Sequence, residues 1–66
     1  MIKVEELRTD GSRKRIGRFA TFADAKRHVQ SQPYVIIEYD PVYAYCADVF
    51  LTDGRTWRIQ PEGLNV

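Results

Sequence analysis

The tripeptide Thr-Asp-Gly occurs twice in this 66-residue chain, at residues 9–11 and 52–54, each time between stretches of strand-forming residues. Gly adopts a positive φ without a Cβ penalty, and Asp tolerates turn conformations, so both tripeptides predict tight hairpin turns. Turn chemistry used twice explains the repeat more simply than a duplicated ligand motif does. The repeat therefore constrains the fold to contain two β-hairpins, one near each end of the sequence.

Charge decides the loop length of the first hairpin. A two-residue loop would set Arg8 opposite Arg13, and like charges across a ladder are destabilising. A three-residue loop, with Gly11 in the left-handed position, shifts the register by one residue and brings opposite charges together. The pairs predicted by the three-residue loop are Glu6–Lys14, Glu5–Arg15 and Val4–Ile16.

Apolar residues decide the loop length of the second hairpin. A three-residue loop sets Val49 opposite Trp57 and Ala47 opposite Ile59, so that the apolar side chains of both strands share one face. A slip of one residue would send these side chains to opposite faces. The second hairpin therefore predicts the same loop as the first, on independent grounds.

One short helix is predicted between the hairpins. Thr21 and Asp24 form a weak capping box, and Phe22 begins an apolar face that continues through Ala25 and Val29. Pro33 ends the helix or marks the loop after it. Residues 34–40 then predict a strand with apolar residues on both faces, which is typical of a central strand.

The element order ββαβββ predicts an α+β fold, an antiparallel sheet of about five strands with one short helix packed on one face. We expect a single domain over residues 1–66, with 61–66 as a loose C-terminal tail. The longest apolar run is too short to cross a membrane, and the first residues lack a signal-peptide segment. We therefore expect a cytoplasmic protein without membrane contact (in the host cytoplasm, if it is phage-encoded).

Residue types that carry catalysis or bind metals are scarce. His28 and Cys46 are the only residues of their kinds, no paired spacing predicts a zinc site, and the glycines are isolated rather than grouped in a phosphate loop. A Cys–His nucleophile pair stays an open alternative, although no third orienting residue is indicated. We expect no enzyme, no metal and no cofactor.

The near-neutral net charge of +1 conceals a segregated distribution. Residues 13–27 carry six basic side chains and one acidic one, whereas no Lys or Arg occurs between Tyr34 and Gly54. A strand charged on both sides is typical of a sheet edge or a protruding arm. The candidate partner-binding cations are Arg13, Lys14, Arg15, Arg18, Lys26 and Arg27.

Tyrosines gather in the acidic segment. Tyr43 and Tyr45 follow a Pro turn and would project to the same side of a strand. Tyrosine is enriched at protein interfaces because it combines a large rigid ring with a polar tip. We expect these two residues to anchor a protein partner, with the basic residues steering the approach; a role in covering the core is the structural alternative.

The short capped helix "FADAKRHV" and the strand pair closing on "TDGRTWRI" resemble the small phage-encoded anti-CRISPR inhibitors of the ββαββ kind. This resemblance implies stoichiometric, non-catalytic binding to a CRISPR–Cas or other nucleic-acid-handling complex. The alternative is a small nucleic-acid-binding regulator that uses the basic hairpin and helix. A homodimer through an exposed sheet edge is compatible with either hypothesis.

Overall fold

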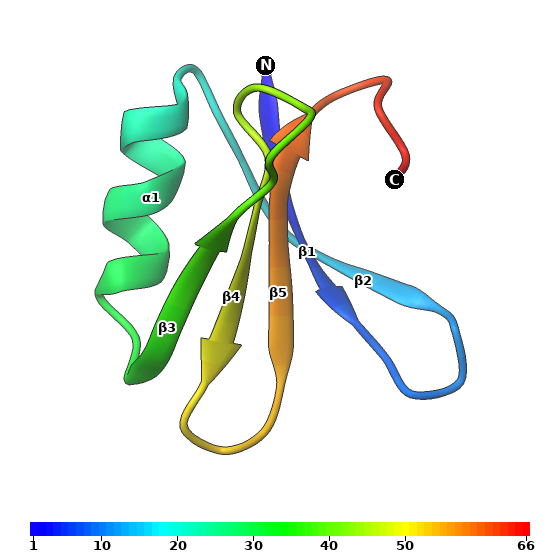
Figure 1. The fold of residues 1–66 in the computed structure, drawn as a ribbon, viewed down its shortest axis with the longest axis vertical. Coiled ribbons are helices and arrows are strands. Elements are labelled where there is room, and N and C mark those ends of the chain that lie inside the picture. Colours follow the sequence, from blue (N-terminus) through cyan, green and yellow to red (C-terminus); the bar gives the residue numbers. More distant parts are fainter.

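The computed structural model describes residues 1–66 and contains one helix and five strands in the order ββαβββ (Figure 1). The predicted α+β fold class is therefore confirmed. The helix lacks the length and apolar character that a membrane crossing requires. The elements are β1 (Ile2–Leu7), β2 (Arg13–Phe19), α1 (Phe22–Gln30), β3 (Tyr34–Tyr39), β4 (Ala47–Leu51) and β5 (Thr56–Pro61).

All five strands form one antiparallel sheet in the order β2-β1-β5-β4-β3. The pairing of β1 with β5 joins the two hairpins, so both Thr-Asp-Gly turns lie at the same end of the sheet (Figure 1). α1 covers one face, called the helix face below. The opposite face, called the open face, carries the last residues of the chain (Figure 1).

Both hairpins have the predicted three-residue loops. Arg8 donates a backbone hydrogen bond of 2.9 Å to Ser12, and Leu51 donates one of 2.9 Å to Arg55. Gly11 and Gly54 close the loops at φ values of 87° and 94°, in the region where a Cβ is strained. The predicted pairs Glu6–Lys14, Glu5–Arg15, Val49–Trp57 and Ala47–Ile59 are confirmed.

The predicted pair Val4–Ile16 is wrong. Val4 lies opposite Gly17, because an irregularity between Val4 and Glu5 leaves Ile16 as an extra residue in β2. A Cβ at position 17 would lie 3.0 Å from the Phe19 ring, so this close approach suits Gly. The shift lets Phe19 pair with Ile2, next to the core. Charge pairing near the turn carried no information about this bulge.

The helix begins as predicted. The Thr21 hydroxyl oxygen accepts a 3.1 Å hydrogen bond from the amide of Asp24, and Ala25 and Val29 are buried against the sheet. Burial of this apolar face, rather than helix propensity, stabilises so short a helix. The core between α1 and the sheet consists of Ile2, Val4, Ala25, Val29, Val49, Leu51, Trp57 and Ile59.

The position expected for the third strand is wrong: β3 is an edge strand, not a central one. Its neighbour on one side is β4, and α1 packs mainly over β1, β2 and β5. Val35 and Ile36 are consequently 69% and 50% exposed. Apolar residues on both faces are usual in a central strand, but here they border solvent because nothing pairs with the outer side of β3.

Pro61 closes β5, so the segment expected to form a loose tail is shorter than predicted and begins at Glu62. This segment contacts the open face. Lys3 donates a 2.8 Å hydrogen bond to the Asn65 side chain, and both Arg13 and Arg58 donate to the main-chain oxygen of Val66. These contacts connect the end of the chain to β1, β2 and β5.

Candidate protein-binding surface

The loop between β3 and β4, residues 40–46, is organised around Asp40. One oxygen of the Asp40 carboxylate accepts hydrogen bonds of 2.8 Å from the amides of both Val42 and Tyr43. The Asp40 amide in turn donates a 2.9 Å bond to the Cys46 carbonyl. The amide of Tyr43, followed by that of Val42, lowers the pKa of Asp40, so the carboxylate remains ionised and holds the loop together at neutral pH.

Tyr45 is held in an unusual backbone conformation within this loop. Its φ of 58° makes it the only residue other than Gly in the left-handed region. A bulky residue rarely adopts that conformation, and such strain is concentrated at functional sites. The residue nevertheless stays 64% exposed, and its ring rests against Phe22, with the ring centroids 6.0 Å apart. The strain therefore does not serve to bury the side chain.

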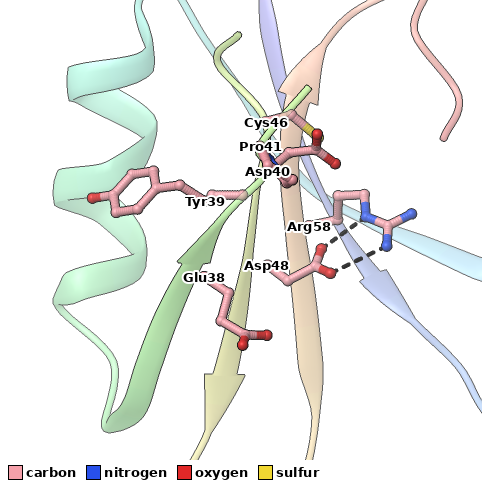
Figure 2. A pocket seen from close by; sticks show the side chains of 8 residues that line it. Glu38, Tyr39, Asp40, Pro41, Cys46, Asp48 and Arg58 are labelled. Atoms are coloured by element: carbon pink, nitrogen blue, oxygen red, sulfur yellow. Dashed lines mark hydrogen bonds and ion pairs between the residues drawn. The ribbon is translucent and has the colours of Figure 1, made fainter. Parts of the chain in front are cut away.

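Tyr39, at the end of β3, packs against the same Phe22 ring as Tyr45. The residue is 55% exposed, its ring centroid lies 6.3 Å from that of Phe22, and the Lys26 ammonium lies 5.2 Å from the centre of the ring. Figure 2 shows Tyr39 pointing toward α1, away from Glu38 and Asp48. We call Phe22, Tyr39 and Tyr45 the aromatic surface; beside it lies an apolar hollow of about 280 Å³.

A second hollow, of about 360 Å³, lies behind the same loop (Figure 2). Arg58 forms a two-pronged contact with Asp48, at 2.8 and 3.2 Å, and the hydrogen bond to Asp48 raises the pKa of Arg58. Burial raises the pKa of the Cys46 thiol, which therefore stays protonated and weakly nucleophilic at neutral pH. The residues lining this acidic pocket are Glu38, Tyr39, Asp40, Pro41, Cys46, Ala47, Asp48 and Arg58.

His28 and Cys46 are not brought together. The His28 ring lies between Phe19, with the centroids 5.1 Å apart, and Trp57, with a stacked geometry at 6.5 Å. Cys46 instead lines the acidic pocket beside Asp40. No group of three His, Cys, Asp or Glu side chains is placed to hold a metal ion. The Cys–His nucleophile pair that the sequence left open is therefore not formed.

The six predicted basic residues do not form one surface. Lys14 pairs across from Glu6 on the helix face of β2, whereas Arg15 pairs across from Glu5 on the open face. Lys26 lies near β3, at the other edge of the sheet from β2. The structure thus places Arg13, Arg15 and Arg18 on the open face of β2, and Lys26 and Arg27 on α1.

Carboxylates neutralise half of these cations. The ion pairs are Arg13–Glu5 at 3.4 Å, Arg18–Glu62 at 2.8 Å and Arg27–Asp24 at 3.0 Å. Lys14 and Arg15 form no ion pair, and both are exposed on β2. β2 is an edge strand, as its charge pattern predicts. Its unpaired positive charges are therefore those of Lys14 and Arg15, which are consecutive in sequence but lie on opposite faces of β2.

Sequence reasoning missed Phe22 and Tyr39 as parts of a surface. Phe22 lies on the apolar side of the helix and therefore looked like a core residue. The sequence does contain one indication that Phe22 borders the surface. Lys26 follows Phe22 by four residues, so the two share a side of α1. What brings Tyr39 to that side is the sheet pairing of β3, which no local pattern specifies.

Comparison with protein-family models, with curated proteins and with solved structures finds no match for this chain.

Proposed function

We propose that this chain is a non-catalytic protein-binding module and that its partner contacts the aromatic surface together with Tyr43. The observation that carries this proposal is the conformation of Tyr45, an aromatic residue that has a left-handed backbone and nevertheless stays largely exposed. A fold that gained nothing from the exposed ring would favour Gly or Asn at this position. The cost of the strain is explained if the ring anchors a partner.

The neighbouring residues support a protein partner. Tyr39 and Tyr45 are packed against Phe22, so little conformational entropy remains to be lost when they enter an interface. Lys26, whose ammonium lies over the Tyr39 ring, and Thr21, which lines the apolar hollow, supply polar groups around the rings. An apolar centre with polar groups at its border is the usual composition of a protein interface.

The acidic pocket supports binding over catalysis. Its Asp40 carboxylate is occupied by two loop amides, Asp48 is occupied by Arg58, and the Cys46 thiol is protonated. A general base or a nucleophile needs a free group at a suitable pKa. These side chains act instead as supports for the loop that carries Tyr43 and Tyr45.

The resemblance to anti-CRISPR inhibitors suggests a finer proposal. In that case the partner is a CRISPR–Cas or other nucleic-acid-handling complex in the host cytoplasm, and binding blocks it stoichiometrically. Arg15 and Lys14, which lack ion-pair partners, would then steer the module toward an acidic surface. Inhibition is measured by titrating a purified nuclease complex with the chain, and a loss of activity that is complete at a fixed molar ratio is the expected result.

The double variant Tyr43→Ser/Tyr45→Ser tests the binding proposal. The tagged chain first captures partners from a host lysate, and the affinity of a purified partner is then measured for each variant. Loss of two anchoring rings should weaken binding by about tenfold or more, because such residues carry most of the energy of an interface. Arg8→Ser, an exposed change in the first turn, is the matched control and should bind normally. An unchanged affinity of the double variant contradicts the proposal.

Nucleic-acid binding through β2 is the alternative, favoured only by the free charges of Lys14 and Arg15. A mobility shift on mixed DNA and RNA distinguishes the two hypotheses. Phosphate contacts make affinity fall steeply as salt rises, and Arg15→Glu should abolish such a shift. A shift that survives Tyr43→Ser/Tyr45→Ser but not Arg15→Glu would favour the alternative.

A further inference from the structure

The two edges of the sheet differ sharply in how they are protected. Both edge strands contain an irregularity, at Ile16 in β2 and at Val35 in β3, so the difference lies in charge: β2 carries Arg13, Lys14, Arg15 and Arg18, which discourage pairing with another strand. β3 has no Lys or Arg, and Glu38 is its only charged residue. The same chain therefore protects one edge and leaves the other open. This contrast makes β3 the edge with which another strand can pair.

The outer side of β3 offers free backbone groups for pairing. The Asp40 amide bonds to the Cys46 carbonyl, so residues 40 and 46 form a hydrogen-bonded pair of the β3–β4 ladder. Such pairs alternate along an antiparallel ladder, which makes Glu38–Asp48 the next one. The amides and carbonyls of Ile37 and Tyr39 consequently point away from β4, toward solvent.

Exposed side chains lie on both faces of this strand. Ile37 and Tyr39 pair with Val49 and Ala47 and so lie on the helix face, whereas Ile36 and Glu38 lie on the open face. A covering group must therefore contact both faces while it pairs with the backbone between them. A β-strand does this, while a helix laid on one face does not. An extended strand is therefore the element that fits this edge.

We propose that the occupant is β3 of a second copy, paired antiparallel about a two-fold axis at Ile37. This register sets Ile37 opposite its own counterpart and Ile36 opposite Glu38 of the other copy, and it separates the two Glu38 carboxylates. A register centred on Glu38 would place like charges face to face. Pairing with β2 of another copy meets the charged edge and generates an open chain of molecules, whereas the β3–β3 contact closes on itself.

The resulting assembly is one continuous antiparallel sheet of two copies. It removes the only unprotected edge and buries Val35 and Ile36. This additional apolar burial stabilises a chain whose own core is small. A two-fold axis perpendicular to the sheet keeps both aromatic surfaces on the same side. The dimer thus presents two copies of that surface. This inference does not depend on the proposed function, because it rests on the free backbone groups of β3 and on Val35, Ile36 and Glu38 rather than on the ring of Tyr45.

Replacing Ile36 by an acidic residue in one variant and by a basic residue in another tests the register of the β3–β3 pairing. Sedimentation equilibrium of the wild-type chain should give about twice the chain mass of 7.7 kDa, and hydrogen exchange should show protected amides at Ile37 and Tyr39. Ile36→Glu places two carboxylates opposite the two Glu38 side chains and should weaken the dimer by at least about tenfold, while Ile36→Lys pairs with Glu38 and should retain it. The double variant Ile36→Glu/Glu38→Lys should restore the dimer.

Position 36 is half exposed, so all these variants should keep the circular dichroism spectrum of the fold. Arg15→Glu, on the other edge, is the control and should leave the mass unchanged. A wild-type chain that stays monomeric at every concentration overturns the proposal, and so does equal weakening by Ile36→Glu and Ile36→Lys. Protection of Ile37 and Tyr39 only after a different protein is added would assign the edge to that protein instead.

Discussion

Tyr45 is a single residue whose backbone conformation is unfavourable within an otherwise regular fold. Its backbone is left-handed at φ 58°, which costs a residue with a Cβ about 1–2 kcal/mol relative to Gly. The contact between its ring and that of Phe22 stabilises the fold by about 0.5–1.5 kcal/mol. The two contributions nearly cancel, so folding alone gives little reason to keep a tyrosine here.

Replacing Tyr45 by Gly and by Ala separates these two contributions. Both variants lose the ring contact, but only Gly relieves the backbone. We expect Tyr45→Gly to leave the free energy of unfolding within about 1 kcal/mol of wild type, and Tyr45→Ala to be less stable than Tyr45→Gly by about 1 kcal/mol. Urea denaturation measures both values. Equal stability of the two variants would show that position 45 is not constrained to positive φ.

At the scale of elements, the two hairpins are local and largely self-determined. Each is closed by a Gly at positive φ, with nothing within 4 Å of the site where a Cβ would stand. A side chain at Gly11 or Gly54 therefore meets no steric obstacle, and any penalty comes from the backbone alone. The helix is equally local at its start, where Thr21 caps the Asp24 amide.

Gly54 gives a direct test of the loop. Gly54→Ala should lower the free energy of unfolding by about 1–2 kcal/mol, since Ala must adopt a left-handed φ of 94°. Gly54→Asn should cost less, because Asn tolerates this region better than other residues with a side chain. Chemical denaturation of both variants checks the order. If Ala proves as stable as Asn, the loop must rearrange to a turn without positive φ.

The hairpins predicted from sequence were right because neighbouring residues contain the necessary information. Turn chemistry, charge pairs and alternation all act within about ten residues of the turn. The β2 bulge at Ile16 and the edge position of β3 were missed for the opposite reason. Both depend on packing against residues distant in sequence, Phe19 against the core and β4 between β3 and β5.

At the scale of the whole molecule, carboxylates connect segments that are far apart in the chain. Glu6 of β1 accepts hydrogen bonds from the Trp57 indole at 3.0 Å and from Arg55 at 3.2 Å. Glu62 accepts one of 2.8 Å from Arg18. The Trp57 bond, aided by Arg55, lowers the pKa of Glu6, and the Arg18 bond lowers the pKa of Glu62.

These pKa directions predict acid sensitivity. A carboxyl group with a lowered pKa in the folded state stabilises the fold above its unfolded pKa of about 4.3, and this contribution is lost as pH falls through the folded value. The urea midpoint should therefore drop between pH 5 and pH 3. Glu6→Gln should show a smaller drop over the same range, because its amide does not titrate. An identical drop in wild type and Glu6→Gln would remove Glu6 from this network.

Only part of the candidate binding surface could be predicted from the sequence. Tyr43 and Tyr45 could be selected because they follow a Pro turn and tyrosine is enriched at interfaces, and both are exposed in the structure. The basic residues looked like one patch because they are close in sequence, yet a strand alternates faces and the helix lies across the sheet from Arg13, Arg15 and Arg18. Proximity along a chain that crosses between elements does not predict proximity in space.

By itself, the sequence determined the hairpin loops, the capped helix, the element order and the α+β class, since each depends on backbone preferences and side-chain periodicity within a short window. The tertiary structure alone decided that β5 inserts between β1 and β4, that β3 becomes a bare edge, and that Phe22 meets Tyr39 and Tyr45. Strand order is set by how one small core is buried most completely, and that quantity belongs to the whole chain rather than to any segment.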